Sequence, residues 1–278
     1  MTHAARSRWC CRCALGRIIG LIALLCLVSS SAAAFTLNVV LEDADNRPFE
    51  YLDTDGHLTG FHVELVRLVC ADLGWQVSFH RIPWLRAQAQ LESGAADAVT
   101  YMGKTAARER YAVFLDDNIL HWSAAELYIR TERQAEIHWE PPIEHMVEHW
   151  NFGIPQGYFL GDDIEKLPKS IASVDHSARS LVELFNMLLS DRIDVAVASV
   201  AGIDEVAQNI PDIALRVRSI ARLKGGPMYI AFTRHDRDGD PAHDFARAYA
   251  AWRKTPAYAG LIERFGVARY TEGALDLR

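Results

Sequence analysis

The sequence predicts an α/β fold built from two units of similar construction, and three observations support this. Strand-like and helix-like segments alternate in the first half of the chain, the alternation starts again after residue 150, and two short segments resemble each other. LESGAADAV begins at Leu91 and LLSDRIDVAV begins at Leu188. Each contains a helix end, a serine, a tight turn and an aspartate that opens an apolar strand, as two similar α/β units would.

The first alternation covers residues 35–102. Its opening segment, FTLNVVLE, is apolar and β-branched, and the helix that follows keeps its apolar residues on one face and ends at Gly74. This order predicts a parallel sheet with helices on its faces. The expected elements are a strand over 35–42, a turn over 53–60, a helix over 61–74, a strand over 76–82, a helix over 84–94 and a strand over 96–102.

The second alternation lies in the rest of the chain. Residues 130–150 contain two adjacent prolines and many charges, which predicts a surface connection with a short irregular helix. The helical pattern near the C-terminus is amphipathic and is interrupted near Pro256. The expected elements are strands over 151–157 and 193–200, a helix over 177–191, a strand and turn over 226–236 and a helical region over 240–266.

Residues 1–34 have the pattern of a secretory signal peptide. Four arginines precede an apolar run from Ile18 to Val28, and small residues follow up to Ala32-Ala33-Ala34. The run is shorter than a membrane span needs. We therefore predict cleavage after Ala34, a periplasmic location and a mature chain without a membrane span. A retained membrane anchor is the alternative.

Charge and cysteine content change when this segment is removed. The whole chain has a net charge of −7, and the loss of four arginines gives the mature chain −11. An acidic secreted protein is a poor binder of nucleic acid. Cys70 is then the single remaining cysteine, so the mature fold has no internal disulfide and depends on its hydrophobic core.

The order of these segments resembles the bacterial periplasmic solute-binding proteins of family 3, the amino-acid type that serves ABC importers. RPFEYLDTDGHLTGFHVELVRLVCADLG is similar to the opening of that family, IPWLRAQAQLESGAADAV with KTAARERYAVFLDD to its next block, and YAGLIERFG to its closing helix. The PWLRA block is most similar to a subgroup whose ligands are often unassigned. The resemblance covers roughly residues 36 to 267.

The resemblance implies a two-lobed fold, often called a Venus flytrap, in which two parallel-core sheets are joined by two hinge strands and the ligand binds between the lobes. Lobe 1 would comprise residues 35–127 and 229–278, and lobe 2 residues 128–228. The crossings would lie near Leu127–Tyr128 and Tyr229–Ile230.

The family's carboxylate clamp is the arginine of a Thr-x-x-Arg turn. Here that turn begins at Thr105, and the spacing of six residues before Phe114 selects Arg108 rather than Arg110. The planar guanidinium suits the role, because it can grip a carboxylate with two parallel charge-assisted hydrogen bonds. We expect Arg110 to be a surface charge.

Other candidate ligand-binding residues follow from the same comparison. Tyr101 and Gly103 occupy positions that line the family's pocket, and Gly103 would offer its backbone N–H to an anion. Trp84 could form an apolar wall, with a core tryptophan as the alternative. The remaining candidates are Arg86 as a second cationic contact, with a helix-surface role as the alternative, and Asp43 and Glu50 as acids for an amine.

The chain departs from the family at three positions. The acid that takes the ligand's α-ammonium in lobe 2 is replaced by Ser199, which cannot neutralise a buried ammonium. The usual Gly-Thr pair is Gly157-Tyr158, and Asn46 stands where an aromatic residue often stacks on the ligand. The sequence therefore predicts a carboxylate-bearing ligand and leaves open an amine held by different acids.

The function that the resemblance implies is capture of a small solute and its delivery to an ABC permease, by a monomer without cofactor or catalytic residues. Two alternatives remain: a ligand-sensing partner of a membrane receptor, and an enzyme similar to cyclohexadienyl dehydratases. The motif HMVEH, from His145 to His149, fits an inverted zinc-protease pattern, but its segment lacks the long amphipathic helix of such enzymes. We predict no metal site.

Overall fold

The structure is a computed structural model that describes residues 35–168, 170–236 and 239–271. The expected signal peptide lies outside these residues. Within the described ranges, no helix has the length and apolar character that a membrane crossing requires.

A nine-stranded sheet connects most of the chain. Its two ends are parallel, whereas its middle is antiparallel. The parallel strands come from segments that alternate with helices, as the sequence predicts. In spatial order the strands are β4 (Gln76–Ile82), β1 (Thr36–Glu42), β5 (Ala98–Gly103), β11 (Val217–Thr233), β7 (Ile119–Arg130), β10 (Val195–Ser199), β8 (Phe152–Gly153) and β9 (Val174–Asp175), and β6 (Ala112–Val113) pairs with β11.

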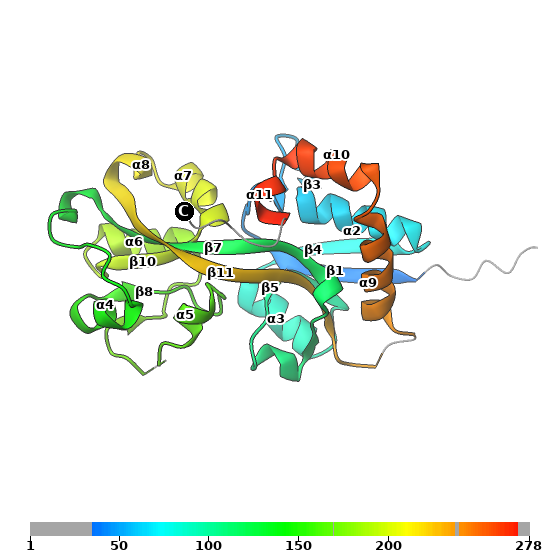
Figure 1. The fold of residues 1–278 in the computed structure, drawn as a ribbon, viewed down its shortest axis with the longest axis horizontal. Helices are drawn as coiled ribbons and strands as arrows, with labels where there is room; N and C mark the ends of the chain where they lie inside the picture. Colours follow the sequence, from blue (N-terminus) through cyan, green and yellow to red (C-terminus); the bar gives the residue numbers. More distant parts are fainter. Residues whose placement is uncertain (1–34, 169, 237–238, 272–278) are drawn as a thin grey trace, which may run out of the picture. The chain divides into compact units, whose positions relative to one another are not determined.

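Two long strands, β7 and β11, join the two ends of this sheet (Figure 1). They are antiparallel to each other, and β11 also pairs with β5 while β7 also pairs with β10. Their pairing is interrupted between Lys224 and Pro227, where β11 contains Gly225 and Gly226. The predicted pair of parallel cores is therefore present, linked by one continuous two-strand connection.

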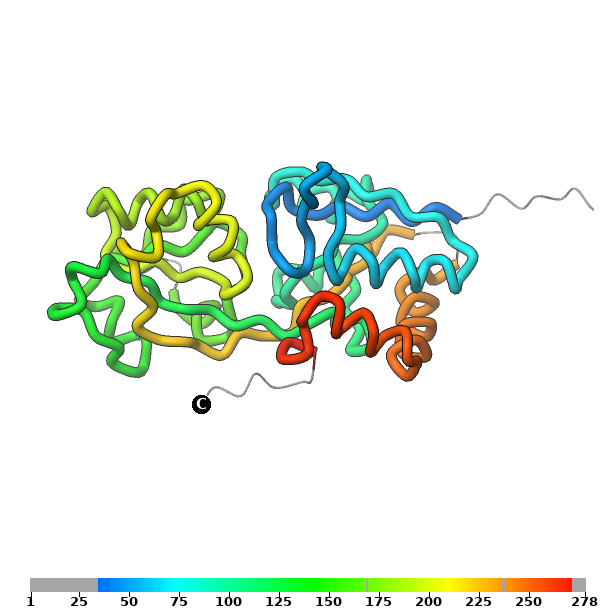
Figure 2. Tube along the Cα trace, turned by 90° about the horizontal axis from the view of Figure 1, so that it is seen from above, coloured from blue at the N-terminus to red at the C-terminus, as the bar shows by residue number. Residues whose placement is uncertain are grey.

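Helices cover both parallel ends. At the β4–β1–β5 end, α3 packs against β1 and β5, α2 packs against β4, and the C-terminal helices α9 and α10 pack on α2 (Figures 1 and 2). At the other end, α6 packs on β10 and β8. The helices are α2 (Phe61–Asp72), α3 (Trp84–Glu92), α4 (Ile143–His149), α5 (Asp162–Glu165), α6 (Leu181–Leu189), α7 (Ile203–Asn209), α8 (Ile213–Arg216), α9 (Pro241–Trp252), α10 (Pro256–Phe265) and α11 (Ala268–Thr271).

Short elements complete the chain. The turn expected over 53–60 lies in a hairpin of β2 (Tyr51–Leu52) and β3 (Leu58–Thr59). The expected strand over 151–157 is shorter, because β8 ends at Gly153 and Pro155 cannot donate to a ladder. The 3₁₀ turns within the described ranges are η1 (Arg108–Arg110), η2 (Asp116–Asn118), η3 (Thr131–Arg133) and η4 (Val200–Gly202).

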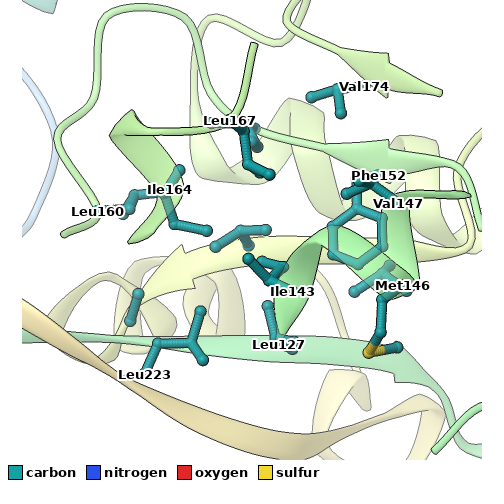
Figure 3. Close-up of a cluster of buried hydrophobic side chains, with 14 of the residues drawn as sticks. Leu127, Ile143, Met146, Val147, Phe152, Leu160, Ile164, Leu167, Val174 and Leu223 are labelled. Carbon is teal, nitrogen blue, oxygen red and sulfur yellow. The ribbon is translucent and has the colours of Figure 1, made fainter. Parts of the chain in front are cut away.

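Separate clusters of buried side chains fill the two ends. One cluster at the β4–β1–β5 end is centred on α3 and β5 and includes Trp84, Leu91 and Met102. At the opposite end, α4, β8 and the β7–β11 pair share a second cluster, in which Phe152, Met146 and Leu127 point toward one another (Figure 3). Cys70 is buried as a free thiol. The buried residues of the first cluster all belong to the expected lobe 1, and those of the second belong mainly to the expected lobe 2. The boundaries of the lobes remain a prediction.

Candidate ligand-binding site

A cavity lies where the carboxyl ends of several strands meet. Parallel strands bring their carboxyl ends to one edge of a sheet, which is where α/β proteins usually bind ligands. The residues at this cavity come from the ends of β1, β5 and β10, from the loops after β1 and β8, from α3 and η1, and from the β7–β11 pair. They are Glu42, Asn46, Trp84, Thr100, Tyr101, Gly103, Arg108, Ser123, Tyr158, Phe159, Leu160, Ser199 and Met228.

The cavity has a volume of about 40 Å³. A ligand pocket typically measures roughly 300–1,000 Å³, so this one would have to widen to admit a solute. A second, larger cavity of about 400 Å³ adjoins it and includes Gln88, Tyr111, Glu165 and His176 in its lining. Arg108 and Tyr158 line both cavities.

Arg108 places a buried positive charge at this position. Its side chain is only 5% exposed, its Nη1 donates to the carbonyl of Gly103 at 2.7 Å, and its Nε donates to Oε1 of Gln88 at 3.3 Å. Burial lowers its pKa, yet an arginine stays protonated in proteins. Among the described residues, no carboxylate lies within 4.0 Å of it.

The turn of η1 explains why Arg108 points inward. The backbone N–H of Arg108 donates to the hydroxyl of Thr105 at 3.2 Å, which fixes the start of the turn. Its guanidinium lies 5.6 Å from the Trp84 ring, within cation–π range. Arg110 leaves the same turn on its outer side and is exposed.

The backbone carbonyl of Gly157 is a hydrogen-bond acceptor shared by three side chains. It accepts from Nε1 of Trp84 at 2.6 Å, from Arg108 Nη2 at 2.5 Å and from Nε2 of Gln88 at 3.4 Å. Gly157 has φ +77°, and a Cβ there would approach Leu85 and Gln88 to 2.8 Å. The loop after β8 is therefore held against α3 and η1 through one backbone oxygen.

Glu42, the last residue of β1, brings a carboxylate to the cavity. The hydroxyl of Tyr158 donates to one of its oxygens, and Nδ2 of Asn46 donates to the other at 3.2 Å. Burial is the main reason why its pKa is raised to about 7, and these two hydrogen bonds oppose the shift. A carboxyl group with such a pKa is common at functional sites.

Glu205 on α7 is a second carboxyl with an unusual environment. Its Oε2 atom is buried and accepts no hydrogen bond from the part of the chain that the structure describes. Burial, followed by the charge of Glu42 and then that of Asp45, raises the pKa of Glu205 to about 7.

A buried polar chain lies behind Tyr101. Glu50 Oε1 is 2.7 Å from Nδ1 of His62, and Nε2 of His62 is 2.9 Å from Nδ1 of His121. Phe49 stacks on both imidazoles, with ring centroids 4.9 and 4.0 Å away. Burial raises the pKa of Glu50 and lowers those of both histidines, so all three groups favour their neutral forms.

The predicted ligand-binding residues divide into two sets. Six of them line the 40 Å³ cavity: Trp84, Tyr101, Gly103, Arg108, Tyr158 and Ser199. Gly157 lines the larger cavity. The other three lie elsewhere: Asp43 and Arg86 are exposed on the surface, and Glu50 is 1% exposed but bonded to His62.

Glu42 lines the cavity but is not among the residues predicted from the sequence. Glu42 could have been found, because it ends a predicted strand whose carboxyl end faces the ligand in the resembling family. The motif from His145 to His149 forms the short helix α4, and neither histidine belongs to a metal-ligating group among the described residues.

Comparison with known proteins decides the family. Residues 39–191, just over half of the chain, match the bacterial extracellular solute-binding proteins, family 3. The chain belongs to this family. The resemblance predicted from the order of the sequence blocks is thereby confirmed. A search among curated protein sequences finds no match.

Solved structures of solute-binding proteins share the fold. An ancestral arginine-binding protein bound to arginine has a TM-score of 0.65 at 21% identity, covering 83% of this chain and 97% of that one. A histidine kinase sensor domain similar to periplasmic binding proteins has 0.70 at 19% identity, covering 86% and 98%. A Salmonella typhimurium periplasmic binding protein with high arginine specificity has 0.62 at 21% identity, covering 84% and 99%. The predicted two-lobed α/β fold is confirmed.

Proposed function

We propose that this solute-binding protein captures a small carboxylate-bearing solute, an amino acid or a related organic acid, and delivers it to an ABC permease. The observation that carries the proposal is Arg108, a buried guanidinium that lines the cavity without a carboxylate partner among the described residues. A ligand carboxylate would replace neutral carbonyl acceptors with a charge-assisted, two-pronged contact, which is about twice as strong.

Capture would proceed by hinge closure. The loop after β8 contacts α3, η1 and Glu42 through Gly157 and Tyr158, and the small cavity between them supports a closed arrangement. A solute that contacts both sides binds this arrangement better than an open one and so increases its population. The Gly225–Gly226 interruption of β11 is the place where we propose the bend.

The experiment is a thermal shift measurement with a panel of amino acids and organic acids. We expect at least one compound to raise the Tm of the wild type, because a ligand at 100 times its Kd stabilises by about 2.7 kcal/mol. Arg108→Ala should abolish this shift, whereas the matched control Arg110→Ala, with an exposed side chain, should keep it. A panel without any active compound, or an unchanged shift in Arg108→Ala, would refute the proposal.

A sensing role is the first alternative, and the similarity to a histidine kinase sensor domain favours it. Both roles require the same ligand-binding cleft and differ only in the membrane partner. Pull-down of the liganded protein with membrane extract separates them: recovery of a permease supports transport, and recovery of a receptor kinase supports sensing. We further propose secretion to the periplasm by the N-terminal signal peptide, and a monomer in solution.

A cyclohexadienyl-dehydratase-like enzyme is the second alternative. Glu42 has a raised pKa and lines the same cavity as the Arg108 guanidinium, which could hold a carboxylate, and such a carboxyl is suited to acid–base chemistry. We nevertheless propose binding without turnover. Incubation with prephenate or arogenate should therefore yield no aromatic product by absorbance, and product formation that disappears in Glu42→Gln would establish the enzyme.

A further inference from the structure

The aromatic ring of Phe159 fills space beside the small cavity. Phe159 lies in the loop after β8, is 8% exposed and lines the 40 Å³ cavity. A Cβ added at Gly103 would lie 2.2 Å from its ring, and one added at Gly226 would lie 2.8 Å from it. Because carbon atoms pack best at about 3.5–4.0 Å, the ring can occupy this position only while both residues are glycines.

The two glycines belong to neighbouring strands. Gly103 ends β5 and Gly226 lies in β11, where Met228 pairs with Gly103. Met228 is 3% exposed and lines the same cavity, so the surroundings are apolar. We call the space over Gly103 and Gly226 that the Phe159 ring occupies the glycine recess. Its occupant comes from a different part of the chain and leaves the recess if the loop after β8 withdraws.

The same loop also occupies the guanidinium of Arg108. The carbonyl of Gly157, two residues before Phe159, accepts from Arg108 Nη2 at 2.5 Å. Arg108 Nη1 donates to the carbonyl of Gly103 at 2.7 Å, so the guanidinium and the glycine recess meet at Gly103. A neutral carbonyl is a weaker acceptor than a carboxylate, and a ligand carboxylate can therefore displace it from Arg108.

We propose that residues 157–159 are an internal substitute for the solute, and that the solute is a carboxylic acid with an aromatic ring. Its carboxylate replaces the Gly157 carbonyl on Arg108, and its ring replaces that of Phe159 in the glycine recess. Because both contacts meet at Gly103, the carboxylate and the ring lie close together in the solute. This inference rests on the proposed function and narrows the class of solute.

The internal contact lowers the apparent affinity for the solute. The solute binds only those molecules in which the loop has withdrawn, so its apparent Kd increases as that fraction decreases. Removal of the Phe159 ring should therefore strengthen the binding of an aromatic acid. A residue that merely supported the site would have the opposite effect, because its removal would weaken binding. The sign of the change separates a displaced occupant from a supporting wall.

The test is isothermal titration calorimetry with matched acids. Each aromatic acid is compared with its ring-free counterpart: phenylacetate with acetate, 3-phenylpropionate with propionate, and L-phenylalanine with L-alanine. The proteins are the wild type, Phe159→Ala, the more conservative Phe159→Leu, and Phe159→Ala combined with Gly226→Ala, whose added methyl group projects into the emptied recess. The control Leu68→Ala removes an apolar side chain that is 41% exposed on α2 and lines neither cavity.

We expect at least one aromatic acid to bind the wild type at least about tenfold more tightly than its ring-free counterpart, because its ring is buried in the recess. Phe159→Ala should bind that acid at least about tenfold more tightly than the wild type does, and Phe159→Leu should show a smaller gain. The added Gly226→Ala should remove the gain, and Leu68→Ala should bind as the wild type does. If Phe159→Ala does not fold, Phe159→Leu decides the sign.

Two sets of results would contradict these expectations in different ways. Ring-free acids that bind as tightly as the aromatic acids, or Phe159 variants with unchanged or weaker affinity for aromatic acids, would overturn the inference alone. Failure of every acid to bind the wild type, or binding that is unaffected in Arg108→Ala, would instead refute the proposed function.

Discussion

At the scale of single residues, Glu42 shows how burial turns an ordinary acid into a group poised near neutral pH. Its two hydrogen bonds, from Tyr158 and Asn46, stabilise the carboxylate but do not offset desolvation. The neutral form of the Glu42 carboxyl therefore dominates in the folded protein at mildly acidic pH. Burial, with the charge of Glu42 as the next cause, raises the pKa of Glu205 to about 7 as well.

Glu42→Gln should change the pH dependence of stability. A carboxyl with a folded pKa of about 7 binds more protons in the folded than in the unfolded state between pH 4.5 and 7, so its contribution is lost as pH rises. Relative to the wild type, we expect the ligand-free variant to gain about 1–3 kcal/mol at pH 8 compared with pH 5. Urea unfolding at both pH values measures this, and equal differences at the two would contradict it.

The buried histidines should act in the opposite direction. The pKa values of His62 and His121 are lowered, so the unfolded chain binds more protons than the folded protein below about pH 6.5. The free energy of unfolding therefore decreases as the pH is lowered. We expect roughly 1–2 kcal/mol of loss per imidazole at pH 5. His121→Phe should reduce this acid sensitivity in urea titrations, and imidazole NMR signals of the wild type that titrate near 6.5 would argue against the neutral network.

Some residues of the cavity could be predicted from the sequence and others could not. The spacing to Phe114 separated Arg108 from Arg110, and the structure buries the first and exposes the second. The sequence pattern favours Asp43, whereas the structure brings Glu42 to the cavity and exposes Asp43. Neighbouring residues of a strand point to opposite faces, so an error of one position moves a side chain from cleft to surface.

At the scale of elements, α2 and the loop that follows β1 are held together by a close backbone approach. Gly60 precedes α2 with φ +120°, and a Cβ there would lie 2.2 Å from the carbonyl oxygen of Phe49. This contact sets the entry of α2 beside the loop that carries Asn46. The sequence marked a turn over 53–60, but the close approach depends on the fold and had no local signal.

Gly60→Ala should therefore destabilise the protein strongly, by about 3 kcal/mol or more, since strained φ and a backbone clash add. The matched control is Gly56→Ala, where φ is also positive, at +80°, but nothing lies within 4 Å of the added Cβ. We expect about 1 kcal/mol there. Chemical denaturation compares the two, and similar losses would contradict the role of the close approach.

At the scale of the whole molecule, the order of blocks predicted the family and the fold because each block is an α/β unit with its own periodicity. Residues from distant parts of the chain then meet at the cavity, as Glu42, Arg108 and Tyr158 do. Those meetings depend on the register of β7 and β11 and on the closure of the loop after β8. Neither can be read from local pattern.

Tyr158→Phe should shift the ligand-free protein toward an open arrangement. The substitution keeps the ring but removes the hydroxyl that donates to Glu42 across the cleft. We expect a larger radius of gyration by solution X-ray scattering without ligand, and the same compact value as the wild type at saturating ligand. Identical ligand-free scattering of the two proteins would mean that this contact does not hold the cleft closed.

The central claim is that Arg108 anchors the solute, and the Kd of the tightest compound of the thermal shift panel tests it most directly. Calorimetry should show Arg108→Lys weakened at least about tenfold, because lysine keeps the charge but loses the planar fork. Arg108→Ala should be weakened about 100-fold or more, and Arg110→Ala by less than about twofold. An Arg108→Ala protein that binds with the wild-type Kd would contradict the account.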